Sequence, residues 1–193
     1  ICISEYCKND VSFYCDVKNK PIYVIHNGTN TLTRPELLNE SYIPVKPFIF
    51  SLGTVTPKKN FHTLLPLVKD QHNLELVIAG RIDDVSYYQS ILDMAKTMGV
   101  SKKINLVGPI SESEKSWYFN NCYAFAFPST AEGFGLPVTE AMSVGKPLFL
   151  SHKTALPEIG GDVAFYFRNF SAAHMKETFV AGMKQYVRFN MQD

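Results

Sequence analysis

Residues 127–142 read FPSTAEGFGLPVTEAM and place a strand end, a glycine-rich turn and a helix start in direct succession. The apolar run 124–127 closes at Pro128, as a buried strand does, and Pro137 suits the first turn of a helix, where its missing N–H costs nothing. Glycines in the turn let the backbone approach a ligand, and the free N–H groups of a helix start attract phosphate. The stretch therefore predicts an anion site in a strand-to-helix loop.

Two carboxylates flank this turn. Glu132 precedes it, close to where a bound sugar would lie, and Glu140 falls about one turn inside the helix. A carboxylate in the second position can accept hydrogen bonds from vicinal hydroxyls such as those of a ribose. The alternative is a plain connecting loop with two solvated glutamates, and for an isolated pair of glutamates that alternative is the better interpretation.

Apolar runs begin near residues 48, 74, 104, 124, 147 and 164 and alternate with helical patterns. This alternation predicts an α/β domain with a doubly wound parallel sheet of the Rossmann-like kind. Ligands of such sheets bind beyond the carboxyl ends of the strands. Candidate residues that follow predicted strand ends should therefore converge on one cleft, and they are Gly53 to Lys59, Gly80 and Arg81, Gly108 and Pro109, and residues 129–136.

The segment 132–140, supported by the other strand ends in the same order and spacing, resembles the glutamate, seven residues, glutamate motif of retaining glycosyltransferases of family 4. The resemblance implies the C-terminal half of a GT-B fold, which binds a nucleoside-diphosphate sugar and passes the sugar to an acceptor. It implies that Glu132 orients the donor sugar as a catalytic residue and that Glu140 holds the ribose. The turn residues that it implies as further donor contacts are Gly133, Phe134, Gly135 and Leu136.

Residues 53–59 resemble the glycine-to-lysine loop of the same family, which begins here at Gly53. The resemblance gives Lys59 the catalytic contact with the donor diphosphate, although two adjacent lysines taken alone read as a solvated surface pair. Many relatives carry an arginine where this chain has Thr54, so a second positive contact must come from Lys58 or Arg81, or be missing. The following residue, Asn60, is expected to cap the next helix.

Val107, Gly108 and Pro109 resemble the loop that packs against the donor base, and an ordinary buried strand end is an equal alternative. Residues 111–114 have the pattern of a capping box at a helix start. The stretch 156–162 reads LPEIGGD and resembles a mainly structural part of the family, which makes Glu158 a weak site candidate.

The chain has 193 residues, too few for the two nucleotide-fold domains of a complete GT-B enzyme. By resemblance, residues 1–30 are a remnant of the N-terminal acceptor domain and the start of the linker, 31–47 are linker, and 48–193 are the donor domain without its last crossover helix. The expectation is a fragment that binds donor better than it catalyses. A saccharide or lipid-linked acceptor would be held mainly by the missing domain.

A net charge of +1 argues against a nucleic-acid partner, and no apolar run reaches the length of a membrane span. The expected location is cytoplasmic, with peripheral association of the full enzyme at the inner membrane face. The cytoplasmic expectation follows from the lack of a visible membrane span or signal peptide. The membrane association follows from the Gly53-Thr54 loop and the stretch 156–162, which resemble those of bacterial surface-polysaccharide and lipopolysaccharide enzymes, some of which transfer mannose from a guanosine donor. Base, sugar and acceptor are not fixed by the sequence.

No cofactor or metal is expected. The four cysteines lack Cys-x-x-Cys spacing, Asp83 and Asp84 do not form an Asp-x-Asp motif, and the resemblance implies chemistry without a metal ion. Two other functions stay open: a non-catalytic nucleotide-binding domain, and an epimerase-like GT-B enzyme that isomerises a nucleotide sugar.

Overall fold

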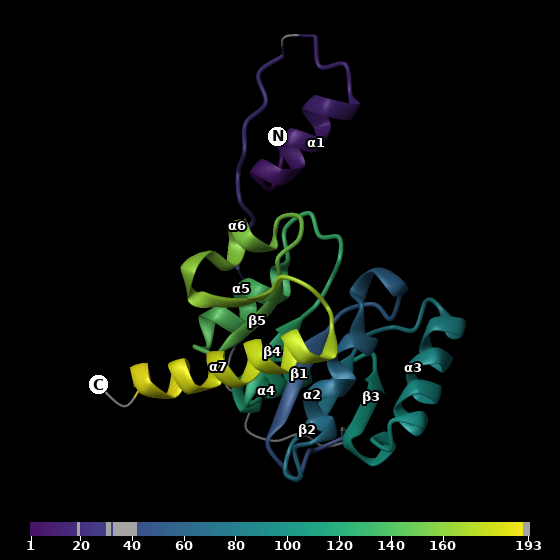
Figure 1. The fold of residues 1–193 in the computed structure, drawn as a ribbon. Helices are drawn as coiled ribbons and strands as arrows, with labels where there is room; N and C mark the ends of the chain where they lie inside the picture. Colours follow the sequence, from purple (N-terminus) through teal and green to yellow (C-terminus); the bar gives the residue numbers. More distant parts are fainter. Residues whose placement is uncertain (19, 30–31, 33–41, 191–193) are drawn as a thin grey trace.

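The structure, a computed structural model, describes residues 1–18, 20–29, 32 and 42–190. Most of the predicted linker 31–47 lies outside the described residues, so its boundaries stay a prediction. Figure 1 shows an α/β body and, standing on it, a smaller unit that contains α1 (Glu5–Tyr14). We call this smaller part, residues 1–18 and 20–29, the N-terminal unit.

The described residues of the body form one six-stranded parallel sheet with the order β3-β2-β1-β4-β5-β6. Each strand starts within one residue of its predicted position, and the order reverses between β1 and β4, so the predicted doubly wound parallel sheet is confirmed. The strands are β1 (Phe48–Leu52), β2 (Glu75–Ala79), β3 (Ile104–Gly108), β4 (Ala124–Phe127), β5 (Leu148–Ser151) and β6 (Ala164–Phe167).

Helices cover both faces of the sheet, with α7 crossing in front in Figure 1. The helices of the body are α2 (Leu65–Lys69), α3 (Val85–Thr97), α4 (Glu112–Asn121), α5 (Leu136–Ser143), α6 (Leu156–Gly160) and α7 (Ala172–Asn190). Four short 3₁₀ turns join them, η1 (Pro57–Lys59), η2 (Phe61–Leu64), η3 (Ser101–Lys103) and η4 (Gly161–Val163). The sequence between the strands therefore supplies two helical layers around one sheet.

Alternate residues of the strands feed two apolar clusters, one on each face. Ile49 and Leu76 pack under α2, α3 and α7, whereas Phe50 and Val77 pack under α4, α5 and α6. Residues of β2, β4 and β5 are buried on both faces, as expected for strands of a parallel sheet that helices cover on two sides. This rigid core fixes where the strands end, and the candidate site is built on those ends.

One local prediction is wrong. Asn60 does not cap a helix with its side chain, because it takes a left-handed conformation with φ 58° between η1 and η2. Its side-chain amide instead donates to the carbonyl oxygen of Pro128 at 3.3 Å. The residue bridges two loops of the site, a long-range role that its neighbours in sequence do not reveal. The capping box predicted at Ser111 and Glu114 is present.

Candidate active site

The loops after β1, β2 and β3 cross in close contact at the carboxyl edge of the sheet. The amide of Gly53 donates to Ala79 O at 2.9 Å, and that of Gly80 donates to Gly108 O at 2.8 Å. A Cβ on Gly80, where φ is 145°, would lie 2.0 Å from Gly53 O. Only glycine fits this crossing, so three of the predicted strand-end residues lie side by side as expected.

Lys59 and Glu132, 73 residues apart in sequence, meet at this edge of the sheet. The Lys59 ammonium forms an ion pair with the Glu132 carboxylate, and the two side chains are 12% and 15% exposed. The Lys59 Nζ also stands 4.8 Å from the centroid of the Phe127 ring. A Cβ on Gly53 would come within 3.0 Å of Lys59 Cε, so the lysine lies directly across that glycine.

Lys58 holds the two loops together through its backbone while its side chain is exposed. Its carbonyl oxygen accepts from the Thr130 amide at 2.8 Å, from Thr130 Oγ1 at 3.1 Å and from Ser129 Oγ at 3.2 Å. These hydrogen bonds fix the turn that carries Lys59 against the end of β4. Sequence analysis missed this role, and the Ser-Thr pair after the strand was its only local signal.

The glycine-rich turn leads into α5 as predicted. Gly135 takes φ 102° just before the helix, and no side chain caps the helix start, so backbone N–H groups remain available there. A Cβ on Gly135 would lie 2.9 Å from Leu156 Cδ2, which shows how closely this turn packs on α6. Phe134 and Gly135 are buried and Leu136 is exposed, so of the two apolar side chains in this turn only Leu136 faces outward.

Glu140 is buried one turn inside α5 and is held by a residue that sequence analysis missed. Its Oε1 lies 2.8 Å from Lys115 Nζ, which also contacts Glu112 at 2.7 Å. Burial alone would lower the pKa of Lys115, but the hydrogen bonds and charges of the two glutamates outweigh it and raise the pKa. Lys115 lies on α4, and only tertiary packing brings it to Glu140.

A groove of about 510 Å³ opens beside the end of β3, where the sequence predicts the base-binding loop. Val107 and Pro109 line it, and Gly108 turns between them with φ 75°. The other lining residues are Tyr42, Ile104, Asn105, Leu106, Ile110, Glu114 and Tyr118. The groove runs along the edge strand β3, from Ile104 at its start to Pro109 just beyond its end.

Two other predicted donor contacts, Arg81 and Thr54, form no ion pair or hydrogen bond with the Lys59–Glu132 pair in the described part of the chain. The Arg81 side chain is 74% exposed and its guanidinium pairs with Asp83 at 2.5 and 2.9 Å. The structure therefore does not bring the Arg81 charge to the Lys59–Glu132 pair. Thr54 lies in the turn after β1, next to Val55, whose amide donates to Arg81 O at 2.8 Å.

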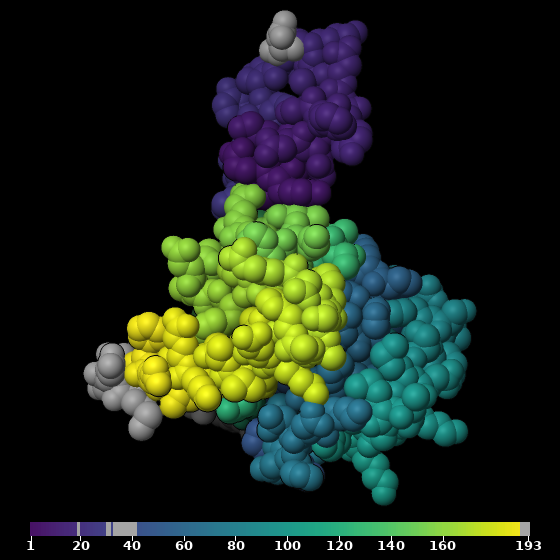
Figure 2. Space-filling model, viewed as in Figure 1, coloured from purple at the N-terminus to yellow at the C-terminus, as the bar shows by residue number. Residues whose placement is uncertain are grey.

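The N-terminal unit contacts the loop that carries Glu132. Ser4 Oγ donates to Gly133 O at 2.7 Å, and Cys7 Sγ donates to the same oxygen at 3.2 Å. Figure 2 shows this unit resting on the yellow-green segment that contains α6. The carbonyl group of the residue after Glu132 is thus held by two side chains of the N-terminal unit.

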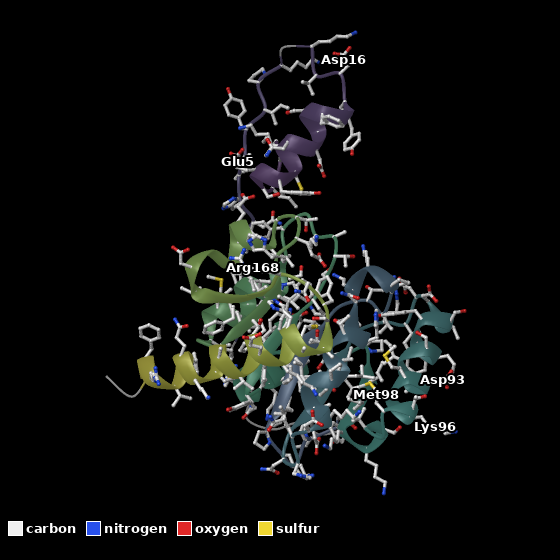
Figure 3. The ribbon with its side chains drawn as sticks, viewed as in Figure 1. Glu5, Asp16, Asp93, Lys96, Met98 and Arg168 are labelled. Carbon is white, nitrogen blue, oxygen red and sulfur yellow. The ribbon has the colours of Figure 1, made fainter. Side chains whose placement is uncertain are left out.

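Glu158, a weak site candidate from sequence, anchors the N-terminal unit. Its carboxylate accepts from the backbone amides of Glu5 at 2.9 Å and Tyr6 at 3.2 Å, and His26 Nε2 lies 2.8 Å away. Figure 3 labels Glu5 at the lower end of α1, where the unit faces the body. Partial burial would raise the pKa of Glu158, but these hydrogen bonds outweigh it and lower the pKa.

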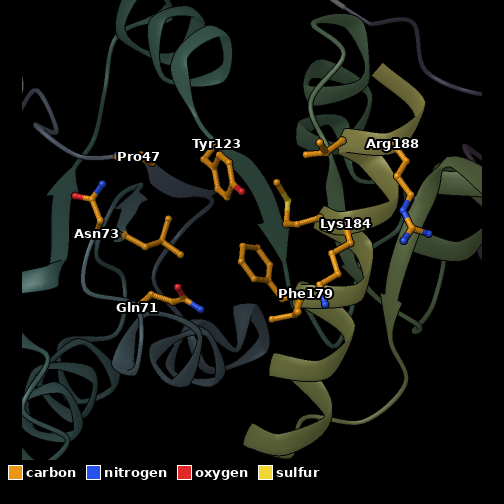
Figure 4. Close-up of a pocket in the computed structure, with 11 residues that line it drawn as sticks. Pro47, Gln71, Asn73, Tyr123, Phe179, Lys184 and Arg188 are labelled. Carbon is orange, nitrogen blue, oxygen red and sulfur yellow. The ribbon is translucent and has the colours of Figure 1, made fainter. Parts of the chain in front are cut away.

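A second groove, of about 640 Å³, lies at the opposite edge of the sheet (Figure 4). Pro47, Asn73 and Tyr123 line it, and they come just before the amino ends of β1, β2 and β4. Its other wall is α7, with Phe179 and Lys184. None of the candidate residues lines this groove, so its size does not make it the active site.

In the part of the chain that the structure describes, no group of three His, Cys, Asp or Glu side chains could hold a metal ion. The same residues contain no helix that is both long enough and apolar enough to span a membrane.

These features define a class, the doubly wound α/β domains that bind a ligand at the carboxyl edge of a parallel sheet. Residues 34–184 match the family model described as glycosyl transferases group 1. The match covers most of the chain, and the chain therefore belongs to the group 1 glycosyltransferase family.

Similar proteins agree with this assignment. The chain is 29% identical over 174 residues to the serotype-specific mannosyltransferase WbdA of Escherichia coli, a match that covers 82% of this chain and 21% of WbdA. It resembles Anabaena HepE, solved in complex with UDP and glucose, with a TM-score of 0.79 and 15% identity over 96% of this chain and 54% of HepE.

A third match bears on the predicted GT-B half. The C-terminal domain of LpcC, a group 1 glycosyltransferase from Francisella tularensis, matches with a TM-score of 0.69 and 21% identity, covering 81% of this chain and 88% of that domain. The predicted C-terminal half of a GT-B fold is confirmed. The chain spans only 21% of WbdA and about half of HepE.

Proposed function

We propose that residues 48–193 are the donor-binding domain of a retaining glycosyltransferase that moves a sugar from a nucleoside-diphosphate sugar to an acceptor. The observation that carries the proposal is the meeting of Lys59, Glu132 and Gly53 at the carboxyl edge of the sheet. A cationic group, a carboxylate and a glycine that meet at the ends of parallel strands suit a ligand that joins a diphosphate to a sugar.

Each part of the donor has a partner in this proposal. Lys59 and the uncapped N–H groups at the start of α5 stabilise the departing diphosphate by fixed positive charge. Glu132 orients the sugar, and the groove at Val107 receives the base. Glu140, whose Oε1 is paired with Lys115, accepts from the ribose hydroxyls. The acceptor attacks from the face that the diphosphate leaves, and the reaction proceeds without a metal ion.

The proposed donor sugar is mannose and the proposed setting is bacterial surface-polysaccharide synthesis, supported by the similarity to WbdA. For the base of the donor, uridine competes with guanosine, because HepE was solved in complex with UDP. The proposal includes a saccharide or lipid-linked acceptor. It also includes a cytoplasmic location, with peripheral association at the inner membrane face.

A thermal-shift titration tests donor binding. We expect one of UDP, GDP or ADP, or its sugar ester, to stabilise this chain by roughly 2.7 kcal/mol at 100 times its dissociation constant. Lys59→Ala and Glu140→Ala should each reduce the shift, because they remove the diphosphate and ribose contacts. A shift that persists in both variants would place the nucleotide elsewhere and overturn the proposal.

A further inference from the structure

Lys59 and Glu132, to which the proposed function gives separate parts of the donor, are partners of each other in this structure. Their side chains are 12% and 15% exposed, so both charged groups are largely removed from water. A charge in such a place is costly when it loses its counter-charge. Neither group is therefore free to bind a ligand until something replaces the other.

Few of the described groups near the pair can replace the counter-charge of Lys59 or of Glu132. Lys59 has the face of the Phe127 ring at 4.8 Å, which stabilises a cation weakly compared with a carboxylate. The Glu132 backbone is fixed, because its amide donates to Thr154 Oγ1 at 3.0 Å. Among the described residues, neither charge has a second ion-pair partner. When Lys59 turns to a phosphate, Glu132 is left without a counter-charge unless the ligand itself supplies donors.

We propose that the donor binds by exchanging the partners of this ion pair, with the diphosphate taking Lys59 and the sugar hydroxyls taking Glu132. This inference rests on the proposed function. A nucleoside diphosphate without sugar completes only half of the exchange, because it pairs with Lys59 and leaves the Glu132 carboxylate facing negative phosphate oxygens. Glu132 is thereby a specificity residue that distinguishes the sugar ester from the bare nucleoside diphosphate.

The same repulsion acts after sugar transfer. Once the sugar has left, Glu132 loses its hydroxyl partners and faces the product diphosphate at a position where its side chain is only 15% exposed. Re-forming the ion pair with Lys59 then competes directly with the product for the lysine. The exchange therefore favours release of the nucleoside diphosphate as well as recognition of the intact donor.

The test is a pair of dissociation constants, measured by calorimetry on this chain. The ligands are whichever of UDP, GDP and ADP stabilises the wild type best, and the glucose or mannose ester of that nucleotide. For Glu132→Gln we expect roughly tenfold tighter binding of the bare diphosphate, with no gain or a loss for the sugar ester. The ratio of the two constants should therefore change by tenfold or more.

Glu140→Gln is the matched control, because a ribose contact belongs to both ligands and its loss should weaken both by the same factor. Glu132→Ala is a second variant. Unlike Glu132→Gln, it leaves no side-chain oxygen that could accept a hydrogen bond from Lys59, and it should change the ratio in the same direction. Unliganded melting temperatures establish that each variant is folded.

The outcomes separate the two proposals. If the wild type binds a nucleotide but both Glu132 variants leave the ratio unchanged, partner exchange is overturned while the donor-binding function stands. If no nucleotide or sugar ester binds the wild type, the proposed function fails and the exchange fails with it.

Discussion

At the scale of single residues, the crossing of Gly53 and Gly80 sets the tightest constraint on the site. A methyl group on Gly80 would meet a backbone oxygen at 2.0 Å, and a backbone atom cannot swing away as a side-chain end can. The φ of 145° at this position adds strain for any other residue. The strand-end glycine is thus required by geometry even before any ligand is considered.

We expect Gly80→Ala to lower the free energy of unfolding by about 2–3 kcal/mol, as overpacking against fixed backbone does. Urea denaturation measures the change. Gly28→Ala is the control, because a Cβ there meets no atom within 4 Å. Equal stability of the two variants would contradict the close crossing of the two loops.

Sequence analysis found the residues of the site better than it found their supports. Glu132 and Lys59 follow strand ends, so their convergence follows from the topology of a parallel sheet. Lys115, Thr154 and the Lys58 carbonyl act through contacts between segments far apart in sequence, and no local pattern marks them. The role of Asn60 was mistaken for the same reason.

At the scale of elements, α4 and α5 are joined by one buried ion pair. Lys115 reaches from α4 to Glu140 on α5, and the side chains are 13% and 7% exposed. The pair orients the carboxylate that the proposed function assigns to the ribose. Strands and helices were predictable because buried apolar runs and capping residues are local signals, whereas this connection between helices is not.

Lys115→Met should destabilise the chain by about 3 kcal/mol at neutral pH, since Glu140 would be buried without its cation. The double variant Lys115→Met with Glu140→Leu should recover part of that loss, because it leaves no buried charge. Chemical denaturation of both variants measures the effect. A double variant less stable than the single one would contradict this account.

The same pair predicts a dependence on alkaline pH. Because the folded pKa of Lys115 is raised, its contribution to stability is complete below the unfolded lysine pKa of about 10.4. The contribution is lost as the pH rises through the folded value. The stability difference between wild type and Lys115→Met should therefore be constant near neutral pH and shrink above about pH 10.4.

At the scale of the whole molecule, the body and the N-terminal unit meet through several hydrogen bonds and a ring contact between His26 and Phe134. Glu158 holds the start of α1, and Ser4 and Cys7 hold the Gly133 carbonyl. The sequence predicted the body well, because its six strands are continuous apolar runs. It did not predict this interface, since the contacts join residues more than 120 positions apart.

Glu158→Gln should loosen the N-terminal unit, and faster hydrogen exchange at the amides of Glu5 and Tyr6 would report it. The wild type should behave similarly in acid. The lowered pKa of Glu158 means that its contribution is complete above the unfolded carboxyl pKa of about 4.3 and is lost as the pH falls through the folded value. Exchange that is equally slow in wild type and variant would contradict the anchoring role.

The contact at Gly133 connects the N-terminal unit directly to the loop that carries Glu132. Ser4 and Cys7 donate hydrogen bonds to the carbonyl oxygen of Gly133, the residue directly after Glu132. Glu158 on α6 accepts a hydrogen bond from the same unit, from the Glu5 amide. The orientation of the N-terminal unit therefore acts on the carbonyl group of the residue after Glu132, and Thr154 Oγ1 holds the amide of Glu132 itself. The orientation of the N-terminal unit is thereby coupled to the position of Glu132 beside Lys59.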